Sequence, residues 1–202
     1  AWADLLQSRY DGLTVNPYTE VLPGLGSLET LFSFVQTILN PVSHDLKPIF
    51  LSPNPFYQIY EGAAILGGGE IRFANCPAPS FKPDWKSITE DVWQRTKVMF
   101  VCSPNNPSGS VLQLEDWQEI FDLQDKYGFI IASDECYSEI YFDGNKPIGG
   151  LQAAAQLGRS NRNIVMFTSL SKRSNVPGLR SGFVAGDAEL LKNFLLYRTY
   201  HG

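Results

Sequence analysis

The sequence is poor in features that would place the protein in several specialised classes. Its 202 residues contain no run of about eighteen apolar residues, which excludes a membrane-spanning helix, and no signal-peptide pattern opens the chain. Lys and Arg number 16 against 21 Asp and Glu and form no basic stripe, which argues against a nucleic-acid surface. We therefore expect a cytoplasmic protein that binds neither membranes nor nucleic acids.

Cysteine and histidine are also scarce. The three cysteines, Cys76, Cys102 and Cys136, are an odd number in unrelated sequence contexts, which argues against a disulfide framework. The two histidines, His44 and His201, lie far apart and have no Cys or carboxylate cluster at ligand spacing. The sequence therefore predicts no metal site.

What is present fits one soluble domain with 44% hydrophobic and 18% charged residues. Short apolar runs alternate with segments of helical periodicity, and the runs are continuous rather than alternating. The expected strands are 20–22, 49–51, 98–102, 129–133, 164–168 and 182–186. This pattern predicts an α/β fold in which a mostly parallel central sheet is flanked by helices.

Helices are expected over 1–9, 28–39, 114–127, 150–157 and 187–202, with Ser27 and Asp187 as N-caps. The Pro-rich segment 71–85 is expected to be a loop. The first helix has no capping signal and the last has no terminator, so the chain looks as if it begins and stops within elements.

The most informative stretch is 169–180, which follows the buried strand 164–168. Ligands of α/β proteins bind at the carboxyl ends of strands. Lys172 lies there between hydroxyl residues, and Arg180 follows eight residues later. A lysine amine beside a phosphate-binding arginine fits pyridoxal 5′-phosphate (PLP), which carries both an aldehyde and a phosphate. The alternative is a surface loop with two solvated cations.

Other polar and aromatic residues follow other strands. The Gly26-Ser27 turn leads into a helix N-terminus, which suits a phosphate but also describes an ordinary capped helix. Tyr57 is placed to stack on a planar cofactor, or to serve as a core or interface aromatic. The amide of Asn106 lies in a rigid turn from which it could donate to a cofactor oxygen, although such turns usually only redirect the chain.

Asp134 directly follows a buried strand, where a carboxylate is costly without a partner. A protonated pyridinium nitrogen would supply that partner. The alternative is a carboxylate that caps a following helix. Tyr137 adds a hydroxyl three residues later.

Three motifs together give the chain a recognisable family pattern: Asn106-Pro-Ser-Gly109, Asp134-Glu-Cys-Tyr137, and Ser169-Leu-Ser-Lys172 with Arg180. Over essentially its whole length the chain resembles the class I/II aminotransferases of the fold-type I PLP enzymes. The resemblance implies a transaminase that works by a ping-pong mechanism through a Schiff base.

The resemblance also implies a role for each candidate. Lys172 would form the Schiff base and later move the proton at the substrate Cα, and Asp134 would pair with the pyridinium nitrogen. Asn106 and Tyr137 would hydrogen-bond the phenolic oxygen, while Tyr57 would stack on the ring. Five residues match the family's phosphate cradle: Gly26, Ser27, Leu28, Ser169 and Arg180.

At a finer level, residues 171–182 are similar to the succinyldiaminopimelate aminotransferases of lysine biosynthesis. That similarity implies amino transfer between N-succinyl-diaminopimelate and 2-oxoglutarate. Two alternatives stay open. One is a PLP-dependent carbon–sulfur β-lyase, which would share the lysine, aspartate and arginine, and the other is an aminotransferase-like sensor domain of a transcriptional regulator.

The chain departs from the family in its extent. Relatives carry an N-terminal arm and a C-terminal small domain that holds the substrate-carboxylate arginine, and both are expected to be missing here. Residues 1–202 would then be the PLP-binding large domain, with 187–202 leading toward the small domain. Relatives also build each active site at a homodimer interface. We therefore expect an active dimeric parent and a fragment that transaminates poorly or not at all.

Overall fold

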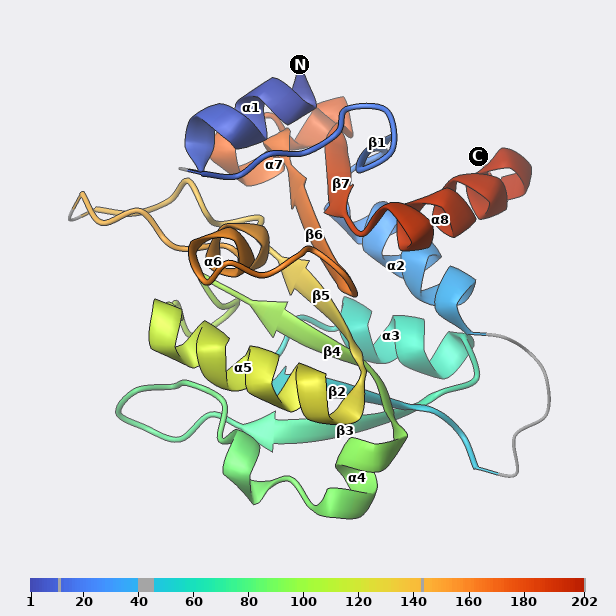
Figure 1. Cartoon of the computed structure of the whole chain (residues 1–202), viewed down its shortest axis with the longest axis vertical. Coiled ribbons are helices and arrows are strands. Elements are labelled where there is room, and N and C mark those ends of the chain that lie inside the picture. Colours follow the sequence, from blue (N-terminus) through green and yellow to red (C-terminus); the bar gives the residue numbers. More distant parts are fainter. Residues whose placement is uncertain (11, 40–45, 143, 202) are drawn as a thin grey trace.

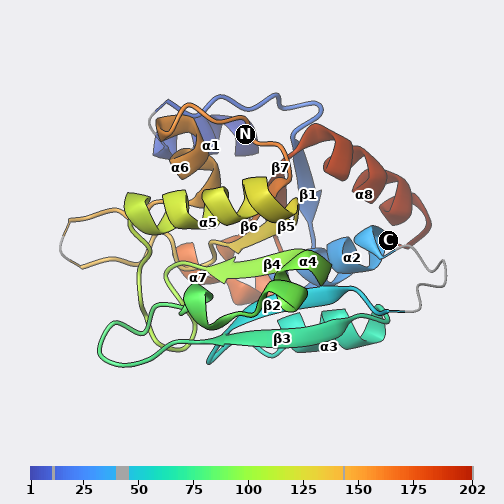
Figure 2. The same ribbon diagram turned by 60° about the horizontal axis from the view of Figure 1, so that its bottom comes forward.

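The protein folds around one seven-stranded sheet with helices on both faces (Figures 1 and 2). The computed structural model describes residues 1–10, 12–39, 46–142 and 144–201. In order across the sheet, the strands are β1 (Val21–Gly24), β7 (Gly182–Gly186), β6 (Ile164–Ser169), β5 (Ile130–Asp134), β4 (Thr96–Cys102), β2 (Ile49–Asn54) and β3 (Glu70–Asn75). The pairs from β6 to β3 are parallel, whereas β7 is antiparallel to both of its neighbours. The expected mostly parallel sheet is confirmed.

Each face of the sheet is covered by its own set of helices. One face carries α1 (Trp2–Arg9), α4 (Glu90–Arg95), α5 (Leu114–Tyr127) and α6 (Gly150–Gln156), and the other carries α2 (Ser27–Ile38), α3 (Ile59–Leu66) and α8 (Ala188–His201). Strand β4 contributes side chains to the apolar cores on both faces of the sheet. Val98 and Phe100 belong to one core, and Met99 and Val101 belong to the other. A strand buried on both faces reads as a continuous apolar run, as the sequence does.

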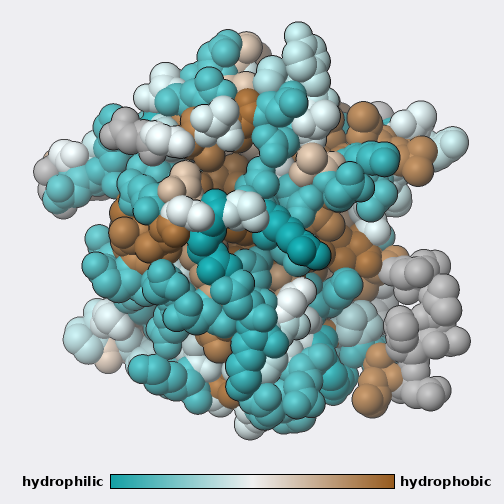
Figure 3. Space-filling view, viewed as in Figure 1, coloured by the Kyte–Doolittle hydropathy of each residue, from teal (hydrophilic) through white to brown (hydrophobic). Residues whose placement is uncertain are grey.

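The outer surface over α5 and α6 is mainly hydrophilic, with smaller apolar patches between the polar side chains (Figure 3). Helix α5 illustrates the reason, since Trp117, Ile120 and Phe121 are buried against the sheet while its charged residues face outward. Among the described residues, no helix is both long and apolar enough to cross a membrane.

The prediction of a loop over 71–85 is wrong in its first part. Residues Glu70–Asn75 form β3, which pairs in parallel with β2 at the edge of the sheet. An edge strand is stabilised by backbone pairing on one side only, so it needs no continuous apolar run. Arg72 is exposed and Ala74 is buried, and this pattern is weak beside the prolines that follow.

Strand direction decides where the connecting loops meet. The carboxyl ends of β2, β4, β5 and β6 lie at one edge of the sheet because these strands are parallel. Strand β1 ends at the same edge and β7 begins there, because β7 is antiparallel to both β1 and β6. Loops from six strands therefore converge at one place, where α/β folds bind ligands. Short helix α7 (Leu170–Arg173) and the 3₁₀ turn Pro177–Leu179 lie between β6 and β7 at this edge.

Candidate cofactor site

A cleft of about 300 Å³ lies at this edge, within the size range of small-molecule sites. The residues that line it come from all of the converging loops: Ser27, Leu28, Tyr57, Asn106, Asp134, Cys136, Tyr137, Ser169, Ser171, Lys172, Pro177 and Arg180. Every site residue expected from the sequence is in this set except Gly26, which adjoins it. The structure thus brings the candidates together, while their individual roles stay predictions.

Arg180 supplies a positive charge to the cleft, and Gly26 packs directly against its guanidinium. The guanidinium of Arg180 donates to the carbonyls of Pro177 at 2.9 Å and Leu25 at 3.2 Å. Gly26 has a φ of +92°, and a Cβ at this position would overlap the Arg180 guanidinium. Glycine is therefore required here both for the backbone conformation and for the close approach of the arginine.

Ser27 does not cap the helix as expected. Helix α2 begins at Ser27 itself, with Gly26 as the N-cap. The Ser27 hydroxyl instead accepts a hydrogen bond from the Cys136 thiol at 2.9 Å. The N-terminus of this twelve-residue helix still suits an anion, since its first two residues, Ser27 and Leu28, line the cleft together with Arg180.

Ser169, at the end of β6, and Lys172, on α7, both line the cleft. The buried Ser169 hydroxyl accepts from the Ser171 amide at 3.3 Å and so caps this short helix. Lys172 is exposed, and its Nζ lies 5.9 Å from the centre of the Tyr137 ring. The amine is therefore accessible at the mouth of the cleft, with an aromatic hydroxyl residue beside it.

Asp134 is the buried acid of the cleft, with only 6% of its surface exposed. Its Oδ2 accepts from the Tyr60 hydroxyl at 2.8 Å and its Oδ1 accepts from the Cys136 amide at 3.2 Å. Burial raises the pKa of Asp134, and these hydrogen bonds act in the opposite direction. The alternative of a helix cap does not hold, because a turn rather than a helix follows Asp134.

The next residue, Glu135, is a second buried carboxylate with different surroundings. It accepts from the Tyr10 hydroxyl at 2.6 Å, from the Ser133 hydroxyl at 2.8 Å and from the Gly150 amide at 2.9 Å. Burial is again the largest cause of a raised pKa. Glu135 ties the segment after α1 and the start of α6 to the sheet, whereas Asp134 faces the cleft.

Two tyrosines supply half-buried rings in the cleft. Burial raises the pKa of both Tyr57 and Tyr137 further above neutral pH. Tyr57 precedes α3, and its ring packs edge-to-face against Tyr60 with the centroids 6.0 Å apart. Asn106 lies in the expected turn, where Asn105 donates to Ser110 at 2.9 Å.

Sequence reasoning missed three residues that contact the predicted ones. Cys136 lies inside the quoted motif but gave no signal of its own, since a buried thiol resembles a small apolar residue. Ser171 and Pro177 also line the cleft. All three cysteines of the chain are free and buried.

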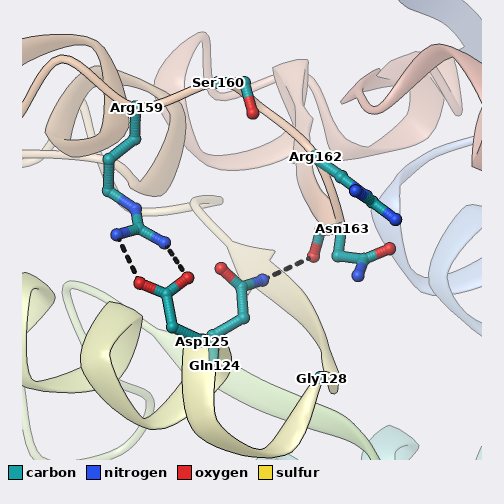
Figure 4. Close-up of a pocket in the computed structure, with 7 residues that line it drawn as sticks. All are labelled: Gln124, Asp125, Gly128, Arg159, Ser160, Arg162 and Asn163. Atoms are coloured by element: carbon teal, nitrogen blue, oxygen red, sulfur yellow. Dashed lines mark hydrogen bonds and ion pairs between the residues drawn. The ribbon is translucent and has the colours of Figure 1, made fainter.

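A larger hollow of about 460 Å³ lies at the opposite edge, beyond the starts of β5 and β6 (Figure 4). Two of its charged side chains are paired with each other, because Arg159 forms a two-pronged ion pair with Asp125. Gln124 donates to the Asn163 carbonyl at 3.1 Å. In the part of the chain that the structure describes, no three His, Cys, Asp or Glu side chains group as metal ligands, and His44 lies outside that part.

The fold and cleft define a class of protein: an α/β domain that carries a lysine, a buried aspartate and an arginine in one cleft at the carboxyl ends of its parallel strands. The chain belongs to the aminotransferase class I and II family, whose model matches residues 1–198. Members of this family depend on PLP, and the donor set of the cleft fits PLP. The acid suits a protonated ring nitrogen, and the arginine with the helix start suits a phosphate.

Individual relatives agree with this family. An LL-diaminopimelate aminotransferase of Syntrophobacter fumaroxidans is 35% identical over 183 residues, covering 89% of this chain and 44% of that protein. The structure of an aminotransferase from Neisseria meningitidis superposes with a TM-score of 0.96 at 78% identity, over 100% of this chain and 50% of that one.

A third relative is a "probable N-succinyldiaminopimelate aminotransferase" from Thermus thermophilus. Its structure superposes with a TM-score of 0.86 at 27% identity and covers 98% of this chain and 50% of that one. The chain therefore spans about half the length of the relatives it matches.

Proposed function

We propose that the full-length parent is a PLP-dependent transaminase and that these 202 residues form its cofactor-binding large domain. One observation carries the proposal. Asp134 ends β5, whereas Lys172 and Arg180 lie in the connection between β6 and β7, and all three line a single cleft. An amine, a buried carboxylate and a guanidinium in this arrangement match the aldehyde, the ring nitrogen and the phosphate of one cofactor.

Bound PLP supplies an aldehyde that condenses with amino groups and a conjugated ring that takes up electrons from the substrate Cα. Arg180 would hold the phosphate through two parallel donors, with the α2 N-terminus and the hydroxyls of Ser27 and Ser169 completing the cradle. Asp134 would keep the ring nitrogen protonated.

The remaining residues would orient the cofactor and move protons. The Tyr137 hydroxyl and the Asn106 amide would donate to the phenolic oxygen. The Tyr57 ring would pack against the cofactor face. Lys172 Nζ would hold the cofactor covalently and, once released by a substrate amine, would carry the proton that leaves Cα.

We propose N-succinyl-diaminopimelate as amino donor and 2-oxoglutarate as acceptor. The sequence run 171–182 and the likeness to the Thermus thermophilus structure support the succinylated donor. Relatives at 35% identity are named LL-diaminopimelate aminotransferases, so free LL-diaminopimelate is the competing donor. Assaying both donors with the full-length parent decides between them.

We also propose that the parent is a cytoplasmic homodimer and that the half-length chain transaminates poorly by itself. Apolar side chains at the rim of the cofactor cleft support a covered surface there: Leu25, Leu28 and Leu179 are 57%, 44% and 66% exposed. Exposed apolar groups that adjoin a site are typical of protein contact surfaces.

The first prediction tests the covalent role of Lys172. We expect titration of the chain with PLP, followed by borohydride, to leave a pyridoxyl group on the peptide that contains Lys172. Lys172→Ala should abolish the label, since no other amine lines the cleft among the described residues. Lys192→Ala is the matched control because Lys192 lies on α8, away from the cleft, and its label should equal that of the wild type.

A full label on Lys172→Ala would contradict the assignment of the lysine. Incubating the full-length parent with an amino acid and no keto acid tests the reaction class. Stoichiometric conversion of the cofactor to its amino form supports transamination, whereas catalytic release of pyruvate and ammonia would identify a carbon–sulfur β-lyase.

A further inference from the structure

Tyr60 is a buried hydroxyl group to which the mechanism above assigns no part. It lies in the first turn of α3, 1% exposed, and its hydroxyl donates to Asp134 Oδ2 at 2.8 Å. Its ring stacks on Phe100 with the centroids 4.7 Å apart and the planes within 12°. The ring is therefore fixed by packing, and its hydroxyl is aimed at the one buried acid that lines the described cleft.

The contact matters because Asp134 is held at both oxygens. Tyr60 donates to Oδ2 and the Cys136 amide donates to Oδ1, so the two bonds together set the plane of the carboxylate. Burial disfavours the ionised form of Asp134, and the hydrogen bond from Tyr60 counteracts that effect. Without Tyr60, Oδ2 would lose its donor and the carboxylate would be held only at Oδ1, by the Cys136 amide.

We propose that Tyr60 is a positioning residue that holds Asp134 ionised and aligned toward the ring nitrogen of the cofactor. The inference rests on the proposed function, because it concerns how the same cleft recognises PLP. In this proposal Tyr60 of α3, held by Phe100 of β4, orients the acid, while the loops at the carboxyl ends of the strands bind the rest of the cofactor. A hydroxyl bound to a buried carboxylate in this way contributes more than one bound to a neutral group.

The chain contains a matched control. Tyr10 is also buried, and its hydroxyl donates at 2.6 Å to Glu135, the residue after Asp134. Glu135 does not line the cleft. Tyr10→Phe and Tyr60→Phe therefore remove the same atom from the same kind of bond to neighbouring carboxylates, only one of which faces the cofactor.

The test compares two ligands on the purified 202-residue chain, with affinities measured by absorbance titration. One ligand is PLP and the other is 1-deazapyridoxal 5′-phosphate, in which carbon replaces the ring nitrogen. We expect Tyr60→Phe to weaken PLP binding by about tenfold or more and to leave the affinity for the deaza analogue no lower. Tyr10→Phe should leave the ratio of the two affinities unchanged.

The outcomes separate the inference from the proposal beneath it. Equal losses for both ligands in Tyr60→Phe, or no loss for PLP, would overturn the role of Tyr60 while the wild type still binds PLP. A wild-type chain that binds neither ligand would overturn the proposed function, and the inference with it. Thermal unfolding of each variant shows whether the fold is intact and separates a loss of folded protein from a loss of affinity.

Discussion

At the scale of single residues, the two neighbouring carboxylates at the end of β5 have different roles. Glu135 accepts three donors that belong to the scaffold, whereas Asp134 accepts two and faces the cleft. Burying an acid without a cationic partner costs stability. Asp134 is therefore a place where the cofactor-free protein gives up stability to keep a binding group.

The second prediction, after that for Lys172, follows from this cost. We expect Asp134→Asn to raise the free energy of unfolding of the cofactor-free protein at pH 7, because the folded-state pKa of Asp134 lies above its unfolded value. The wild type regains stability as pH falls through that raised pKa, so the difference should close toward about pH 4. Denaturant unfolding at several pH values measures it.

The control for this prediction is an aspartate shifted the other way. The hydrogen bond from Arg159 lowers the pKa of Asp125, so Asp125→Asn should reduce stability at pH 7. That loss should also shrink as pH falls, because the lowered pKa makes the ionised wild-type group favourable only above it. If both variants changed stability with the same sign at pH 7, the assignment of a cost to Asp134 would be wrong.

The residue scale also shows what a sequence can reveal of a site. Lys172, Asp134 and Arg180 were predictable because each lies next to an apolar strand, where a charged side chain is costly unless it has a partner. The contact between Tyr60 and Asp134 was not, because the two are 74 positions apart and their meeting depends on the order of the strands. A tyrosine inside an apolar helix is indistinguishable from a core aromatic until that order is known.

At the scale of elements, α5 is the helix with the clearest local signals. It covers Leu114–Tyr127 as expected, and it ends at Gly128, whose φ of +75° suits a left-handed C-cap. By contrast, β3 was missed because an edge strand draws its stability from β2. Elements that carry their own periodicity and capping residues can be predicted from the sequence, whereas elements that are stabilised mainly by pairing with a neighbouring strand cannot.

The third prediction concerns the start of α5. The Asp116 carboxylate accepts from the Gln113 amide at 2.6 Å and pairs with Lys82 at 2.5 Å. Asp116→Ala should lower the free energy of unfolding by about 1 kcal/mol, the usual contribution of a helix-start hydrogen bond. Urea unfolding measures it. Glu115→Ala, on the exposed side of the same turn, should change it by less than about 0.5 kcal/mol, and equal losses would argue against the capping role.

At the scale of the whole molecule, the sheet separates two apolar cores. Leu31 of α2 belongs to one core and Ile120 of α5 to the other, and both are buried. The backbone layer between them prevents a cavity on one side from being filled from the other. The fold class was predictable because such a two-sided sheet leaves continuous apolar runs in the sequence.

The fourth prediction tests that separation. Leu31→Ala should cost about 2–5 kcal/mol and Ile120→Val about 0.5–1.5 kcal/mol of unfolding free energy. In the double variant the losses should add within about 0.5 kcal/mol, since sites without shared partners are independent. Chemical denaturation of the three variants gives the coupling energy. A coupling larger than about 0.5 kcal/mol would mean that the cores communicate through the sheet.

The bond from Arg180 to the Leu25 carbonyl joins residues that are 155 positions apart, and β1 beside it pairs with β7. A ribosome adds about 5–20 residues per second, so Arg180 is synthesised on the order of ten seconds after Leu25. During that interval β2 to β6 are already made. A ligand held by its phosphate would thus be captured only after most of the sheet has been synthesised.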